Sequence, residues 1–265
     1  MMPFNPSPPS RGFSLIEMII AITVLGILSA SAAVFLRGPI TSYFDVERRA
    51  ELADAGELSM AKLAQEVSRA VPNSVRVAPA GGGFYLEFLP VISEGRYRIA
   101  GPGNVLNFGV ANTVFDVLCS PPAVPCPSSG NWVVVNNHLP GANVWTGNSR
   151  AALVNMAGNT LTHTSQTFAS DATDHRFQIA GNPVTYFCDP AAGTLNRYSG
   201  YGISPIQPQP PAGMPDTLAT QITACSATFF SGNLRHAGML ALALTFGNAG
   251  DTLNLYHAIR IETLP

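Results

Sequence analysis

Residues 11–36 read RGFSLIEMIIAITVLGILSASAAVFL, and this stretch decides the fold. After Phe13 the run is apolar and carries a single charge, Glu17, near its start. An ordinary secretory signal has a shorter apolar core, and its cleavage site follows that core. A plain membrane anchor gains nothing from a carboxylate at this depth, because burying an unpaired charge is costly. The stretch therefore fits neither an ordinary signal peptide nor a plain anchor.

The helix predicted from this stretch has two parts. Residues 13–37 are long enough to cross a bilayer, for which about 20 apolar residues suffice. Residues 38–71 predict an amphipathic helix, because apolar positions recur at steps of three and four residues: Leu52, Gly56, Met60, Leu63, Val67 and Ala70. Gly38-Pro39 predicts a kink or local melting between the parts, since proline removes a hydrogen bond and clashes with the preceding turn. Pro72 disfavours helical geometry at the residue before it, so the helix is expected to end there.

Residues 72–265 predict short strands joined by turns. The chain contains 24 Gly and 22 Pro, and Gly81-Gly82-Gly83, Asp189–Gly193 and Gly247–Asp251 are expected hairpin connections. Residues 199–216 predict an exposed loop. The expected strands are Ser74–Ala78, Phe84–Leu89, Arg96–Ile99, Val105–Val110, Val114–Leu118, Trp132–Val135, Thr160–Phe168, Arg176–Ala180, Val184–Cys188, Thr194–Tyr198, Met239–Phe246 and Leu253–Ile261. The predicted fold class is α+β, with a long N-terminal helix packed on a mainly antiparallel sheet.

The charge balance excludes one class of partner. Charged residues make up 11% of the chain, and the formal net charge is −2. No basic excess is present to attract a phosphate backbone or an anionic lipid surface. We therefore expect no nucleic-acid partner.

The run Gly12-Phe13-Ser14-Leu15-Ile16-Glu17 resembles the processing site of type IV prepilins and of type II secretion pseudopilins. Residue types, the length of the leader (residues 1–12) and the following spanning segment all agree with that family. The resemblance implies that a membrane peptidase cuts between Gly12 and Phe13 and methylates the new N-terminal Phe13. The apolar helix then remains on the mature protein, where Glu17 would neutralise the methylated amine of a neighbouring subunit.

Three further stretches are similar to the large minor pilins of MSHA pilus biogenesis and, more distantly, to the J-type minor pseudopilin of type II secretion. They are Val71–Val77, Tyr186–Cys188 with Leu195–Tyr198, and Leu255–Ile261. The resemblance implies a structural protein, not an enzyme, that helps to initiate or cap pilus assembly. A pseudopilin, or an adhesive module carried on a pilin stalk, is the alternative.

This family also implies a location and a set of partners. The protein would sit in the inner membrane as a single-pass protein, with residues 72–265 as a periplasmic β-rich head, and would then enter the pilus fibre or its tip. Its partners would be the prepilin peptidase, other minor and major pilins, the inner-membrane assembly platform and, before assembly, inner-membrane lipid. No cofactor is implied.

Four cysteines, an even number in a chain that faces the periplasm, predict two disulfides. Three pairings are possible, and the local pair Cys119–Cys126 and the distant pair Cys188–Cys225 are favoured. A zinc site is the alternative, but neither pair has CxxC spacing and no histidine is adjacent.

Other chemistry has little support in the sequence. The five histidines (His138, His163, His175, His236 and His257) are scattered and form no HExxH motif, and no GxSxG elbow is present. The glycines 81–83 lack the Lys and Ser/Thr of a phosphate-binding loop. Asn248, Asp251 and Asn254 carry oxygens suited to calcium, but a plain turn is favoured because the spacing is not that of an EF-hand. Tyr198 and Tyr201 are weak candidates for adhesion. We predict no catalytic residue and no metal site.

Overall fold

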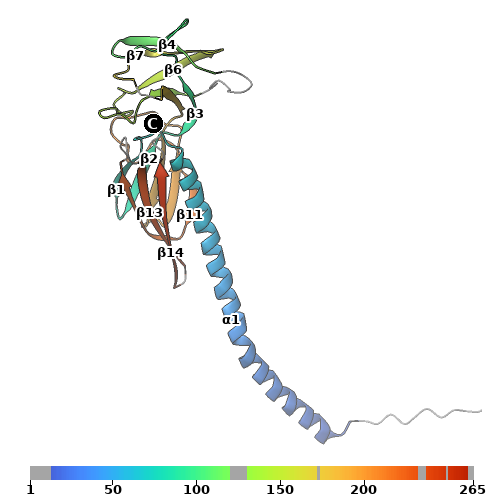
Figure 1. The fold of residues 1–265 in the computed structure, drawn as a ribbon. Helices are drawn as coiled ribbons and strands as arrows, with labels where there is room; N and C mark the ends of the chain where they lie inside the picture. The colour runs from blue at the N-terminus through green and yellow to red at the C-terminus, as the bar shows by residue number, and fades with distance from the viewer. Residues whose placement is uncertain (1–12, 120–129, 172–173, 232–236, 249, 262–265) are drawn as a thin grey trace, which may run out of the picture. The chain divides into compact units, whose positions relative to one another are not determined.

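The computed structural model describes residues 13–119, 130–171, 174–231, 237–248 and 250–261. The chain forms two compact units, one up to Glu51 and one from Leu52 onward, and each is described by itself. The predicted α+β class is confirmed, with a single long helix at the N-terminus of the described residues and antiparallel strands after it (Figure 1).

Helix α1 spans Leu15–Ser68 and contributes to both units. It is continuous through Pro39, so the predicted melting at Gly38-Pro39 is wrong. Proline withholds only the hydrogen bond of its own nitrogen, and the helical ladder continues on both sides. The helix also ends before the predicted Val71, because the Val71 backbone N–H donates to the Leu89 carbonyl at 2.8 Å and thereby joins the sheet region.

Two antiparallel sheets pack with the second part of α1. The five-stranded sheet has the order β1-β2-β9-β10-β11, and the three-stranded sheet has the order β12-β13-β14. The strands are β1 (Arg76–Ala80), β2 (Gly83–Phe88), β9 (Val184–Asp189), β10 (Thr194–Tyr198), β11 (Asp216–Thr220), β12 (Ile222–Phe230), β13 (Gly238–Asn248) and β14 (Asp251–Ile261). The predicted hairpins β1–β2, β9–β10 and β13–β14 are confirmed.

The main core lies between this part of α1 and the two sheets. The helix contributes the predicted stripe, including Leu52, Met60, Leu63 and Val67, and each sheet contributes buried aliphatic and aromatic side chains. Gly56 allows the helix to approach the three-stranded sheet closely, because a Cβ atom built on it would lie 2.7 Å from a Leu255 methyl carbon and 3.1 Å from the Phe246 ring. The apolar periodicity of the sequence therefore locates the packed face of the helix correctly.

A disulfide joins the two sheets of this core. Cys188 lies in β9, Cys225 lies in β12, and their sulfurs are bonded across a separation of 37 residues. In the chain-entropy description, closing a loop of this length stabilises the fold by about 4 kcal/mol. Cys119 is also disulfide-bonded. Its predicted partner, Cys126, lies outside the described residues.

A third sheet of six strands has a core of its own. Its order is β3-β8-β5-β6-β7-β4, and its buried side chains include Phe115, Phe177 and Leu161. The strands are β3 (Val91–Arg96), β8 (Arg176–Ala180), β5 (Trp132–Val135), β6 (Arg150–Ala157), β7 (Thr160–Thr167) and β4 (Ala111–Asp116). Figure 1 shows β4, β6 and β7 beyond the C-terminal end of α1, away from the β13–β14 hairpin.

Two strands predicted in this region are wrong. Residues Val105–Val110 form no strand, because Asn side chains occupy the backbone groups there: the Asn112 amide donates to the Asn107 carbonyl and accepts from the Asn107 N–H. The prediction Arg96–Ile99 also fails, since β3 ends at Arg96. Strands β6, β11 and β12 are present although the sequence analysis did not predict them.

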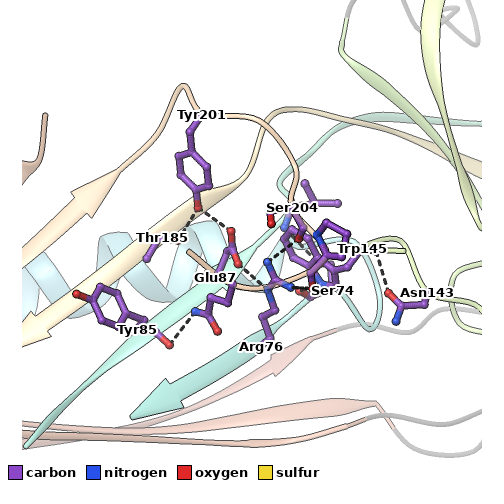
Figure 2. A network of polar contacts seen from close by, with 12 residues as sticks. Ser74, Arg76, Tyr85, Glu87, Asn143, Trp145, Thr185, Tyr201 and Ser204 are labelled. Carbon is purple, nitrogen blue, oxygen red and sulfur yellow. Dashed lines mark hydrogen bonds and ion pairs between the residues drawn. The ribbon is translucent and has the colours of Figure 1, made fainter. Parts of the chain in front are cut away.

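A buried ion pair fastens the loop after β10 to the five-stranded sheet (Figure 2). The Glu87 side chain is fully buried, and Arg76 on the neighbouring strand donates to it through Nε at 2.6 Å. The other two guanidinium nitrogens donate to the carbonyls of Pro205 and Ser204 at 2.8 and 3.0 Å. Tyr201 donates its hydroxyl to Glu87 at 2.9 Å. Residues 199–215 contain no helix or strand, as predicted for an exposed loop, but at Tyr201 the loop is buried against the sheet.

The same arginine reaches the region of the six-stranded sheet. Its guanidinium lies 3.8 Å from the centre of the Trp145 ring, and the Trp145 indole donates to the Ser74 carbonyl at 3.0 Å (Figure 2). Burial raises the pKa of Glu87, whereas the hydrogen bond and charge of Arg76 lower it. Because Tyr201 is buried and hydrogen-bonded inside this network, it is not a free adhesive side chain.

Candidate functional site

The N-terminal helix begins immediately after the predicted cleavage point. Ser14 precedes the first helical residue, and its Oγ accepts a hydrogen bond from the Glu17 backbone N–H at 3.3 Å. Serine at this position caps a helix by satisfying one of its free N–H groups, and a glutamate three residues later completes the pattern of a capping box. A carboxylate in the first turn also suits the positive end of the helix dipole. Residues 14–17 therefore favour a helix start at the observed position.

The first part of α1 has an apolar surface. Phe13 and Leu15 are each 80% exposed, and the side chains of Ile16, Ile19 and Leu25 are at least half exposed. The most apolar 18-residue window has a mean hydropathy of 2.5, and none of it is buried within the chain. Water solvates such a surface poorly. By length and composition, the helix is able to cross a membrane.

The uncharged polar groups of this segment are satisfied within the helix. The Thr23 hydroxyl donates to the carbonyls of Ile19 and Ile20 at 3.1 and 2.9 Å. The Ser31 hydroxyl donates to the Ile27 carbonyl at 2.9 Å. Such bonds lower the cost of placing hydroxyls in an apolar medium. Glu17 remains the only charged side chain between Phe13 and Leu36.

Residues 8–33 match a family model described as the prokaryotic N-terminal methylation motif. The chain has a type IV pilin-like N-terminus. No curated protein and no solved structure matches the chain. The motif implies processing by a prepilin peptidase and assembly with other pilins, and the apolar helix suggests membrane anchoring with a β-rich domain after it. Gly12 lies outside the described residues, so the cleavage between Gly12 and Phe13 stays a prediction.

The remaining candidates from the sequence do not converge on a second chemical centre. Among the described residues, no three His, Cys, Asp or Glu side chains are grouped to hold a metal ion. His236 lies outside these residues. Asn248 pairs with Asp251 where β13 and β14 meet, and the Asn254 side-chain oxygen accepts a hydrogen bond from Thr245 at 2.7 Å. The calcium hypothesis gains no support from these contacts.

His163 is a strand histidine that is buried in the six-stranded sheet. It lies in β7, is 2% exposed, and its ring contacts those of Phe115 and Phe168. Burial lowers the pKa of His163, and a hydrogen bond to the Thr164 carbonyl only partly opposes this effect. The imidazole therefore belongs to the packed core of the six-stranded sheet and is held there in its neutral form.

This placement predicts a loss of stability in mild acid. Below its ordinary pKa of 6.5, the unfolded chain takes up a proton at His163 that the folded chain resists, so unfolding becomes easier as pH falls. For this one group the loss is at most about 1.4 kcal/mol per pH unit. We expect His163→Leu to lose less stability than wild type between pH 7.5 and pH 5.5. Urea unfolding of the detergent-solubilised chain, followed by circular dichroism, measures the difference, and parallel losses in the two proteins would contradict it.

Proposed function

We propose that the chain is a minor type IV pilin, of the MSHA kind and similar to MshO, that helps to initiate or cap filament assembly. The observation that carries this proposal is the methylation motif on a helix whose most apolar window is not buried by any of the residues that the structure describes. A surface of this kind is stable either in lipid or among identical or related helices. Cleavage by the prepilin peptidase would convert the membrane-anchored subunit into one that is ready to pack against the helices of other subunits.

A large head supports a specialised position in the filament. Besides the two sheets that pack on α1, the second unit contains the six-stranded sheet with its own core. Subunits that repeat along a filament have neighbours on every side, whereas a terminal subunit has room for additional structure. The extra sheet therefore favours a subunit that starts or caps the fibre over one that forms its shaft.

Glu17 would fix the axial position of this subunit's helix relative to those of its neighbours. In the proposed filament, its carboxylate pairs with the methylated N-terminal amine of a neighbouring subunit inside an apolar core. Two opposite charges buried together offset much of each other's desolvation cost, whereas either alone is expensive. The pair would select one axial position among apolar helices that otherwise slide past one another.

Deletion of the gene tests this function against the pseudopilin alternative. We expect the deletion strain to lose surface filaments while its export of folded proteins is unchanged, and we expect the wild-type gene to restore filaments. Electron microscopy counts the filaments, and gel analysis of the culture supernatant measures export. Loss of export with normal filaments would assign the protein to a type II secretion pseudopilus, and no change in either would overturn a role in assembly.

A further inference from the structure

Strand β12 (Ile222–Phe230) lies at the edge of the three-stranded sheet. The order of that sheet is β12-β13-β14, so among the described residues β12 has a hydrogen-bonded strand neighbour on one side only. An edge strand presents a row of unpaired N–H and C=O groups on its other side. Nine extended residues give a free edge about 30 Å long. This edge is long enough to accept a complete additional strand.

The sequence of β12 gives its edge no protection against pairing. Natural proteins guard sheet edges with short strands, charged side chains or proline. Of the other outer strands of the two sheets that pack with α1, β1 contains Pro79 and β11 has only five residues. Strand β14 is long but carries Asp251 and Arg260. Strand β12 reads ITACSATFF and has no charged residue, proline or glycine, a composition that suits a strand paired on both sides.

A groove of about 430 Å³ lies beside this edge. Residues 225–229 of β12 line it together with Val77 and Pro79 of β1 and with Gly83 and Phe84 of β2. Successive side chains of a strand point to opposite faces of the sheet. Five consecutive lining residues therefore indicate that the groove follows the main-chain edge of β12 and not only one of its faces.

The lining of the groove restricts what can fill it. None of its lining residues is charged, so a charged segment would lose hydration there without gaining a partner. On the side of the main core, Val77 and Ala227 are only partly buried. Ala227 is small and leaves space between the two strands that a larger apolar side chain can occupy. The groove therefore suits an uncharged segment that brings apolar side chains.

A second copy of β12 would fit the groove poorly. Its inward side chains, Cys225, Ala227 and Phe229, already pack against the core of their own chain, and Cys225 is bonded to Cys188. Such a copy could offer its main chain but no free inward side chain. A segment that belongs to no folded sheet, such as a tail or a long loop, has both its main chain and its side chains available.

We propose that the free edge of β12 binds an extended, uncharged segment of a different protein chain. The segment adds to the sheet as a fourth strand through main-chain hydrogen bonds to β12, and its alternate apolar side chains enter the groove beside Val77 and Phe84. In this mode of recognition the main chain supplies affinity and the alternate side chains supply specificity. The site lies within the second compact unit and does not depend on the proposed function.

Fluorescence anisotropy on the detergent-solubilised full chain tests the proposal with a labelled eight-residue peptide as the probe. In this peptide threonine alternates with valine, and one central valine is replaced by phenylalanine. We expect it to bind the protein and not the detergent alone. N-methylation of its four central amides should weaken binding at least tenfold, because it removes the donors to β12. Replacing the central phenylalanine by alanine should weaken binding severalfold, and replacing it by lysine should weaken binding at least tenfold.

Variants of the protein locate the binding edge. Ser226→Lys places a charge beside the groove at an exposed position of β12, as guarded edges do, and should weaken peptide binding at least fivefold. Thr252→Lys is the matched control, because Thr252 is exposed on β14, the opposite edge of the same sheet. This control should bind the peptide as wild type does. If Ser226→Lys fails to fold, Thr228→Lys takes its place, since Thr228 is exposed and lines the same groove.

Three results would overturn the proposal. The first is no binding of the peptide to wild type, or equal binding of the N-methylated peptide. The second is normal binding to the folded lysine variant of β12 together with weakened binding to Thr252→Lys, which would assign recognition to β14. The third is self-association of the protein that Ser226→Lys abolishes and the peptide does not compete with, which would assign the edge to a second copy of this chain.

Discussion

Replacing Glu17 by Gln is expected to remove the subunit from filaments while leaving it cleaved and membrane-inserted. The amide keeps the size of the side chain, and the capping bond from the Glu17 backbone N–H to Ser14 is unaffected. The change removes the one negative charge of the apolar run. A neighbour's N-terminal amine would then be buried without a counter-charge, which costs several kcal/mol. Since about 1.4 kcal/mol is a factor of ten, incorporation should fall at least tenfold.

Cysteine crosslinking to the other pilins and immunogold counts on sheared filaments measure this effect. Glu47→Gln is the matched control, because Glu47 is exposed on the same helix but lies beyond the apolar run. We expect the control to assemble normally. Unchanged crosslinking and labelling of Glu17→Gln would reduce Glu17 to an interfacial residue and remove charge pairing from the proposal.

Arg76→Leu is expected to be the most destabilising single change in the β-rich unit, with a loss of about 3–5 kcal/mol in the free energy of unfolding. The substitution leaves the fully buried Glu87 carboxylate without a cation and leaves the Ser204 and Pro205 carbonyls without their donors. It also removes the guanidinium from the Trp145 ring. The loop after β10 should loosen first, because these contacts hold it to the sheet.

Two controls separate the buried charge from lost packing. Arg260→Leu, an exposed arginine on β14, should change stability by less than about 0.5 kcal/mol. The loss of unfolding free energy caused by Arg76→Leu should be smaller at pH 5 than at pH 7. Burial already raises the pKa of Glu87, and without Arg76 the folded protein takes up the proton at still higher pH. Stability then declines as pH rises through the interval between the unfolded and folded pKa values. Urea unfolding at both pH values measures this, and a pH-independent loss would contradict the account.

Local patterns predicted the helix and the hairpins because their determinants are neighbours in the sequence. The stripe from Leu52 to Val67 marks the buried face of α1, and Gly81-Gly82-Gly83 marks the turn between β1 and β2. Strand β6 was missed because its Ala- and Leu-containing run resembles a helix segment. The Gly158-Asn159 pair after it, flanked by two apolar runs, was the available signal for the β6–β7 hairpin.

Non-local pairing set the limit on what could be predicted. Strand β3 pairs with β8, and Arg76 contacts Ser204, across long stretches of intervening chain. No periodicity in the sequence encodes such partners. The groove beside β12 is lined by residues of β1, β2 and β12, and only the packing of the two sheets brings these segments together. The N-terminal motif was readable because its chemistry is contained in adjacent residues.

Mass spectrometry of the mature N-terminus tests the central claim most directly. The protein is isolated from the membrane and from sheared filaments, and its N-terminal peptide is sequenced beside that of a Gly12→Val variant. We predict that the wild-type chain begins at N-methyl-Phe13 in both fractions, whereas the variant keeps residues 1–12 and is absent from filaments, because a larger side chain at Gly12 obstructs the peptidase. An intact leader on wild-type protein within filaments, or an unmethylated terminus elsewhere in the chain, would contradict the assignment of this chain to a type IV pilin-like pathway.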